Sequence, residues 1–279
     1  MAVRVLSFAL LGLLACNATP ADSVDAEVSA STFALVSVQR AGLTAQSPRT
    51  ELVARFVRSR SEATATFAAL SPTFVMPPVG TCSNLSTLLP TNDEANGTIE
   101  LLDVGRVEVS SNAAARAALE PRELPNLGNF ARGTFYAHSG TSVMPGARYD
   151  VTAFGSNDLG PLSISAYAPH ELTDIAFNGV VATGSSISLT NEHALRITWT
   201  REAASDLFYV DMTSDSSHET TRCVYADTGL ADVALPASRA QGDRGQLEVH
   251  RLRRHFTSAP IATELRFDFY RSFAFQREP

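Results

Sequence analysis

The chain has 279 residues, a net charge of −7 and an apolar content of 44%. Its 22 basic residues are all arginine, and the acidic excess argues against nucleic acid, whose phosphates must be neutralised by basic groups. The apolar content is sufficient for real cores, and the length fits one large or two ordinary domains.

The N-terminus carries the pattern of a secretory signal. A single positive charge at Arg4 precedes an almost unbroken apolar run from Val5 to Ala15, which predicts a signal peptide over residues 1–15. The run is too short for a transmembrane helix, which needs about 20 residues.

The end of that run, Leu13-Leu14-Ala15-Cys16, resembles the lipobox of bacterial lipoproteins. The resemblance implies that Cys16 is acylated, becomes the new N-terminus and anchors the protein to a membrane of the cell envelope. In that family an aspartate after the cysteine retains the protein at the inner membrane, so Asn17 favours the outer membrane. The alternative is an ordinary signal peptide cut near Ala18 or Ala21.

Residues 16–31 are predicted to be a flexible tether. They are mostly small or acidic, and Pro20 interrupts any helix. About 15 such residues span about 20 Å as a coil, which would hold a domain away from the membrane surface.

Residues 32–169 are predicted to form a first β-sandwich, because short segments partly alternate between apolar and polar residues. The expected strands cover 33–38, 52–58, 63–67, 99–104, 106–110, 134–137, 149–154 and 162–167. The fourth and fifth are expected to form a hairpin around Asp103-Val104-Gly105. The alanine-rich segment 111–119, which ends before Pro121, is the best candidate for a helix, with Ser111 or Asn112 as its N-cap.

Residues 170–279 repeat the same pattern and are predicted to form a second sandwich. The expected strands cover 175–177, 187–189, 195–199, 207–212, 220–225, 231–235, 247–251 and 265–270. Their spacing predicts an all-β fold of two tandem immunoglobulin-like antiparallel β-sandwiches. Trp199 and Cys223 loosely resemble the core tryptophan and later cysteine of immunoglobulin-type domains. The simpler interpretation is that Trp199 is the largest residue of a core.

The body of the chain also resembles uncharacterised lipoproteins of GC-rich bacteria. The residues that carry this resemblance are the run from Tyr149 to Pro169 and the strand Leu195–Trp199. It implies no activity.

Two cysteines remain if Cys16 carries lipid. Cys82 and Cys223 would then lie in an oxidising compartment, where an even number favours a disulfide. Two separate buried thiols are the alternative, because the two positions fall in different predicted domains.

No catalytic motif is present, and the possible metal ligands are loosely spaced. They are His218 with Cys223 and Asp227, and Asp150 with Asn157 and Asp158. The first set fits no standard zinc spacing, and turn chemistry accounts for the second as well as calcium binding does. We therefore expect no catalytic residue, no metal and no cofactor.

Two surfaces could bind a ligand. Arg251 and Arg253 share one face of a predicted strand, next to Arg254 and His255, and form a candidate patch for an acidic glycan or a lipid headgroup. A solvated or edge-protecting face is the alternative. The second is a row of apolar side chains at odd-numbered positions, which would share one face of a strand. This face is either core or an exposed partner surface. The stripe consists of Leu265, Phe267, Phe269, Phe273 and Phe275.

These patterns favour a lipid-anchored envelope protein that acts as a non-catalytic binding or structural module. Its expected partners are the membrane, through the lipid, and an envelope protein or surface polysaccharide, but not nucleic acid. The alternative is a tethered hydrolase of glycans or peptides, whose carboxylates need only lie about 5–10 Å apart in space. A concave pocket with two carboxylates, or a Ser–His pair within hydrogen-bond reach, would distinguish the two.

Overall fold

The computed structural model describes residues 30–42, 48–88, 99–112, 116–124, 131–140, 143–189, 194–235 and 243–278. The signal peptide, Cys16 and most of the tether lie outside these residues and stay predictions. Within the described residues strands dominate, so the all-β class is confirmed. No helix in this part of the chain is long and apolar enough to span a membrane.

The first half holds β1 (Ser31–Gly42), β2 (Arg49–Ser59), β3 (Thr81–Asn84), β4 (Ile99–Leu101), β5 (Val107–Ser111), β6 (Ala117–Leu124), β7 (Ala131–Ser139), β8 (Arg148–Ala153) and β9 (Leu162–Tyr167). The second half holds β10 (Ala176–Phe177), β11 (Val180–Val181), β12 (Ser186–Leu189), β13 (Ala194–Thr198), β14 (Leu207–Ser214), β15 (Thr220–Ala226), β16 (Leu230–Ala234), β17 (Arg244–Thr257) and β18 (Ala262–Arg277). The helical segments are α1 (Ala63–Leu70), the short 3-10 turn η1 (Pro72–Phe74) and α2 (Leu85–Leu88).

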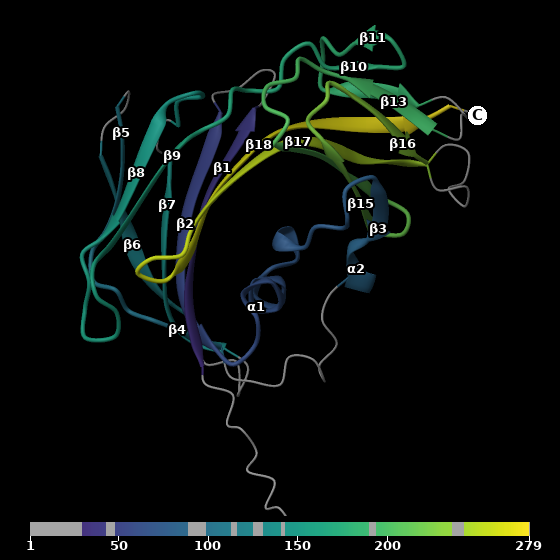
Figure 1. Cartoon of the computed structure of the whole chain (residues 1–279). Helices are drawn as coiled ribbons and strands as arrows, with labels where there is room; N and C mark the ends of the chain where they lie inside the picture. The colour runs from purple at the N-terminus through teal and green to yellow at the C-terminus, as the bar shows by residue number, and fades with distance from the viewer. Residues whose placement is uncertain are drawn as a thin grey trace, which may run out of the picture.

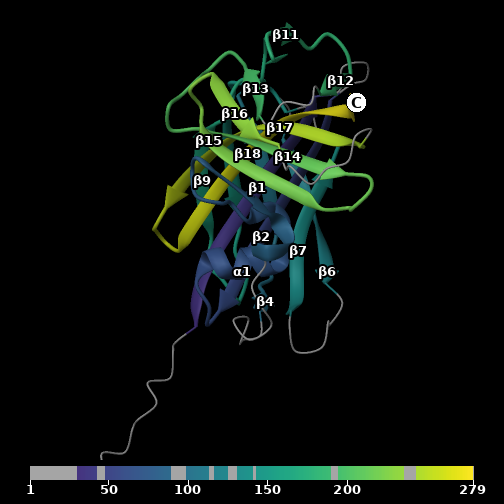
Figure 2. The same cartoon turned by 90° about the vertical axis from the view of Figure 1, so that its right-hand side faces the viewer.

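One long sheet organises the molecule. Its strand order is β3-β15-β14-β17-β18-β1-β2-β4-β7-β6-β5-β8-β9, with β12 also paired to β18. β1 runs parallel to β18, with Val36 opposite Leu265, and β17 pairs antiparallel along β18. The sheet curves around α1 (Figure 1). Seen from the side, β14 and β15 cross in front of β1 and β2 (Figure 2), as the accumulated twist of a long sheet requires.

Two apolar cores lie on the convex face of this sheet. The first lies between the β18-β1-β2 region and β5-β8-β9, and it includes Phe267 and Phe269. The second lies between β14-β17-β18 and a smaller sheet, β11-β10-β13-β16, and it includes Phe273 and Phe275. The predicted stripe, with Leu265, is therefore buried, and its interpretation as core is confirmed.

The strand order crosses the predicted domain boundary between residues 169 and 170. β18 lies between β17 and β1, and β3 pairs with β15, so strands from both halves share one sheet. The division into tandem sandwiches over 32–169 and 170–279 is not confirmed.

The predicted helix at 111–119 is wrong. β5 ends at Ser111, and β6 begins at Ala117 with a buried-exposed alternation through Leu119. Ala117 and Ala118 thus follow a period of two. β6 pairs first with β5 and then, from Glu120 onwards, with β7, and Pro121 lies where the strand changes partner, a place where a missing backbone donor is tolerated.

Two further local predictions are wrong. Residues 63–67 form the start of α1, because Phe67 packs edge-on against Phe33, with ring centroids 5.2 Å apart. The expected hairpin around Asp103-Val104-Gly105 does not form, since β4 pairs with β2 and β7 whereas β5 pairs with β6 and β8. Gly105 has a φ of 69°, a left-handed conformation that lets the chain pass from one layer to the other.

A segment from α1 to α2 covers the concave face of the sheet. α1 and η1 pack there through Phe67 and Phe74, which join a third apolar cluster with Phe33. The far end is attached through β3, where Cys82 lies opposite Cys223 of β15 and is bonded to it, with an S–S distance of 2.02 Å. This covering segment forms one side of a cavity on the concave face.

Candidate functional site

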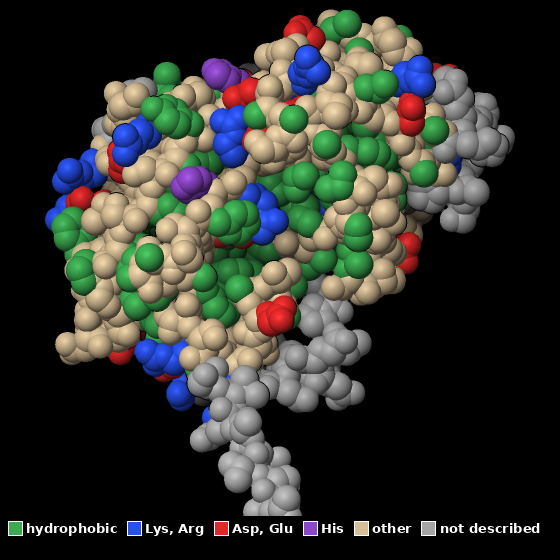
Figure 3. All heavy atoms as spheres, in the orientation of Figure 1, with side chains coloured by type: hydrophobic (Ala, Val, Ile, Leu, Met, Phe, Trp, Pro, Cys, Tyr) green, Lys and Arg blue, Asp and Glu red, His purple; other side chains and the backbone are tan. Residues whose placement is uncertain are grey.

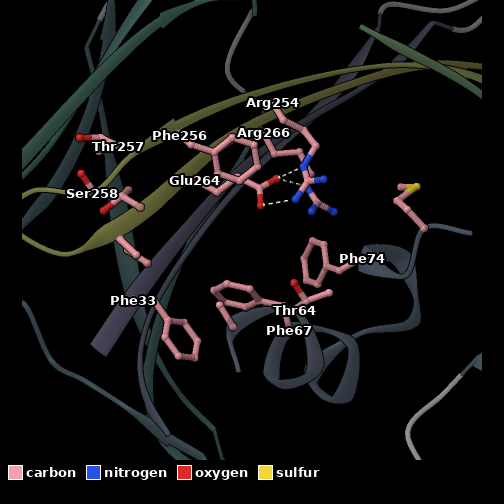
Figure 4. A pocket seen from close by; sticks show the side chains of 15 residues that line it. Phe33, Thr64, Phe67, Phe74, Arg254, Phe256, Thr257, Ser258, Glu264 and Arg266 are labelled. Carbon is pink, nitrogen blue, oxygen red and sulfur yellow. Dashed lines mark hydrogen bonds and ion pairs between the residues drawn. The ribbon is translucent and has the colours of Figure 1, made fainter. Parts of the chain in front are cut away.

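A cavity of about 530 Å³ lies on the concave face, between the covering segment and the β17–β18 hairpin. Its apolar lining includes Phe33, Phe67, Phe74, Met76 and Phe256. Hydrophobic side chains gather in a hollow on this face of the molecule (Figure 3), and Figure 4 shows the phenylalanine rings surrounding it. Phe256 is 59% exposed and extends the apolar lining of the cavity to the surface of the molecule.

One wall of the cavity carries charge. Arg254 donates from Nε and Nη2 to the two carboxylate oxygens of Glu264, at 2.7 and 2.9 Å, and Arg266 donates from Nε to Oε1 at 2.8 Å (Figure 4). Burial opposes the charge of Glu264, but the two guanidiniums hold the pKa of this carboxyl below its usual value. The trio therefore carries a net positive charge beside an apolar cavity.

The ring of Phe74, which lines the cavity, lies close to two arginines. The guanidinium carbons of Arg55 and Arg266 are 5.2 and 5.0 Å from its ring centroid, within the range of cation–π attraction. Nη1 of each arginine is buried without a hydrogen-bond acceptor among the described residues. Burial lowers the pKa of Arg55, and Glu51 opposes that shift. A buried donor without a partner is costly, so the structure would gain if Nη1 of Arg266, a residue that lines the cavity, donated a hydrogen bond to an anionic ligand group.

The predicted patch at Arg251 is wrong as a solvent-facing surface, because this residue is only 2% exposed. Its Nε donates to Asp227 at 3.0 Å, and its Nη1 donates to the carbonyl oxygens of His170 and Glu171, each at 3.2 Å. Nη2 donates to the carbonyl of Thr200 at 2.5 Å. Every arm of the guanidinium is used inside the protein.

Arg253 shares the face of Arg251, as alternation predicts, and it too pairs internally. Its Nη2 lies 2.6 Å from Asp206 and 2.9 Å from Glu202. These bonds join β17 to the chain just before β14, and the partly exposed Arg253 also lines a second cavity of about 480 Å³ with Arg148 and Arg254. The neighbouring Arg254 points to the opposite face, where it lines the cavity together with Arg266.

The residues of the looser zinc pattern do not assemble. Cys223 is bonded to Cys82 in adjacent strands, whereas His218 is exposed in a turn with a φ of 56°. Asp227 is buried and accepts a hydrogen bond from Trp199 Nε1. The side chains are committed elsewhere.

The possible calcium ligands are used locally. Asp150 accepts a hydrogen bond from Ser165 at 2.6 Å. The backbone N–H of Asp158 donates to Ser156 Oγ at 3.0 Å, a turn interaction of the expected kind. Asn157 lies in the same bend.

Sequence reasoning missed the cavity because its two sides come from distant segments. On the sheet side, Arg254 opposite Arg266 and Phe256 opposite Glu264 follow the hairpin register, and alternation alone could have put them on one face. The other side depends on α1, which alternation assigned to a strand.

Comparisons with known proteins add no function. No family model matches the chain, and no curated protein matches it. Among solved structures, a crystal structure of chicken CNTN1 FN1–FN3 domains aligns at 9% identity, with a TM-score of 0.21, over 82% of this chain and 63% of that one. The Danio rerio Fcho1 Mu homology domain with bound Eps15 peptide aligns at 7% identity, with a TM-score of 0.21, over 90% of this chain and 97% of that one. Scores at this level carry no argument about fold or function.

Proposed function

We propose that this protein is a non-catalytic, lipid-anchored binding module of the cell envelope, and that its ligand has an apolar body and an anionic group. We also propose that its packed sheets form immunoglobulin-like β-sandwiches. The proposal rests chiefly on one observation, the cavity of about 530 Å³ with phenylalanines on its lining and a net positive trio on one wall.

The cavity has the size and composition of a small-molecule site. Such sites typically measure about 300–1,000 Å³ and combine an apolar lining with a few placed polar groups. Burying an alkyl chain contributes about 0.8 kcal/mol per methylene, and a charged hydrogen bond contributes about 1.5–3 kcal/mol. A long-chain carboxylate uses both terms, so we take it as the test ligand.

The same lining supports binding over the alternative, hydrolysis. Glu264 is the carboxylate among the described lining residues, and both its oxygens are held by arginines. A depressed pKa and two cationic neighbours make it a poor proton donor or base near neutral pH.

The cavity can be blocked from the helix that covers it. Thr64 is exposed on α1 and lines the cavity, whereas Ala65 is exposed on the same helix and does not line it. We expect native protein to bind dodecanoate in calorimetric titration, T64W to lose at least tenfold in affinity, and A65W to bind as the native protein does. Equal binding by T64W and A65W would refute this site.

The charged wall can be tested separately. Arg254 is partly exposed, with 32% of its side chain accessible, so Arg254→Met should fold. Loss of one charge-assisted hydrogen bond of about 1.5–3 kcal/mol should weaken dodecanoate binding by about tenfold or more and leave dodecanol binding nearly unchanged. An equal loss for both ligands would mean that the arginine shapes the cavity and does not recognise charge.

The lipid anchor is tested on whole cells. We expect the native chain to incorporate labelled palmitate and to fractionate with the outer membrane, and Cys16→Ser to do neither. Two or three acyl chains are needed for stable anchoring, since one chain binds a bilayer only weakly. Incorporation of label by Cys16→Ser would remove the anchor from the proposal.

A further inference from the structure

A second polar cluster lies on the concave face, further along β14 and β17. One oxygen of Asp211, one of Glu248 and one ring nitrogen of His250 lie within 4.8 Å of one another. Asp211 faces Glu248 across the two strands, and His250 follows Glu248 by two residues, so all three side chains point to the same side. They are distinct from the residues that line the cavity.

His250 carries the observation that marks this cluster as more than a group of acids. Its side chain is 6% exposed, and its Nε2 is buried without a hydrogen-bond partner among the described residues. The nearest carboxylate oxygen, Oε2 of Glu248, is 3.7 Å away, beyond hydrogen-bond distance. The ring is stacked between Tyr209 and Tyr270, with centroid separations of 4.0 and 4.8 Å, so Nε2 cannot turn towards another acceptor.

Each of the three side chains is also held by a neighbour. Asp268 lies 2.9 Å from Nδ1 of His250, and Ser272 donates to Glu248 Oε1 at 2.8 Å. Arg222 forms two bonds with Asp211, at 2.7 and 2.6 Å. A carboxylate on Nδ1 fixes a histidine so that Nε2 points at a metal, and such supporting contacts accompany most metal ligands.

The charges leave room for a cation. Asp211, Glu248 and Asp268 are three carboxylates, and among the residues that the structure describes Arg222 is the permanent cation bonded to them. A divalent ion on a neutral imidazole would balance the group.

We propose that Asp211, Glu248 and His250 form a Zn²⁺ site, with Nε2 of His250 and one oxygen from each carboxylate as ligands. One imidazole with two carboxylates suits zinc better than magnesium or calcium, which prefer oxygen alone. The ion reaches the site past Glu248, whose side chain is 32% exposed. Small side-chain movements would bring the three ligand atoms to the usual bond lengths of about 2.0–2.2 Å.

The test uses the full mature chain without an affinity tag, stripped with EDTA and titrated with Zn²⁺ at pH 8 against a chromophoric chelator. We expect one Zn²⁺ per chain and a higher thermal midpoint in the zinc-loaded protein. Mg²⁺ and Ca²⁺ should not compete at equal concentration. Absence of stoichiometric zinc binding, or equal binding of magnesium or calcium, would overturn the proposal.

Four variants locate the site. His250→Gln and Glu248→Gln should each weaken zinc binding by at least tenfold. Because Glu248 is partly exposed, Glu248→Gln should fold even if His250→Gln does not. Ser272→Ala should weaken it by about tenfold, the lower end of the range for supporting contacts. Glu219→Gln, at an exposed acid of the β14–β15 turn, should leave it unchanged. Equal zinc affinity in Glu248→Gln and Glu219→Gln would exclude these ligands.

Discussion

The two faces of β18 are both buried, yet they are built from opposite chemistry. Towards the convex side the strand presents Phe267 and Phe269, which are 0% and 2% exposed. Towards the concave side it presents Glu264, Arg266 and Asp268, which are 7%, 5% and 6% exposed. Neighbours in sequence therefore enter an apolar core and a charged network in alternation.

Stability accounts for the convex face but not for the concave one. Apolar burial is favourable at about 25 cal/mol per Å². Replacing a buried ionic network by well-packed apolar residues is often neutral or stabilising, by about 1–4 kcal/mol. A face that remains charged under a cover is therefore better explained by what it binds, which is the premise of both proposed sites.

The largest loss of stability is expected on the convex side. Phe267 is fully buried, packs against Tyr149 with centroids 5.6 Å apart, and leaves a cavity when truncated. Phe267→Ala should lower the free energy of unfolding by about 3–5 kcal/mol, measured by urea denaturation. Phe256→Ala, at an exposed residue of the cavity, is the control and should cost less than about 1 kcal/mol. Similar losses of unfolding free energy in the two variants would contradict the conclusion that the convex face supplies the stability.

The convex face was also the part that the sequence could predict. The parity of Leu265, Phe267 and Phe269 in a run of β-formers is a local signal, and strand β9 was predicted with its observed bounds. The sheet order was out of reach, because the pairing of β1 with β18 depends on contacts between opposite ends of the chain. Thus local alternation located most strands but not their partners.

A smaller loss is expected from the charged face when one partner is removed. Asp268 is bonded to His250 and to the hydroxyl of Tyr209, at 2.9 and 2.6 Å. In EDTA-treated protein, Asp268→Asn should lower the free energy of unfolding by about 3 kcal/mol. Burial lowers the pKa of His250, but its carboxylate neighbours, Asp268 above all, raise it to about 9, so the substitution leaves a buried cation with a weakened partner. Tyr209→Phe removes a single donor and should cost about 1–2 kcal/mol, measured in the same denaturation assay. An Asp268→Asn protein as stable as native would show that the network is not held by this charge.

The candidate sites were less predictable than the core for a physical reason. Charged residues in a strand ordinarily indicate a solvated face, so Glu264 and Arg266 predict a face that is exposed to water and not one that is covered by another segment. The cover is α1, whose first residues also alternate and were assigned to a strand. Asp211 and His250 lie on different strands, and only their register brings them together.

The pH dependence of the cavity wall is expected to be smaller than the effects of Phe267→Ala and Asp268→Asn. The folded state lowers the pKa of Glu264 below its usual value of about 4.3, so the ionised form contributes stability in full above that value. The contribution declines as the pH falls through the lower folded pKa. Glu264→Gln should therefore cost about 2 kcal/mol at pH 6, the scale of a charge-assisted bond, and the difference from native protein should shrink below about pH 4. Unfolding curves from pH 3 to 7 measure it, with Glu219→Gln as an exposed control. If the difference in free energy of unfolding stays constant down to pH 3, Glu264 contributes through packing and not through its charge. The ion pairs assigned to this wall would then be refuted.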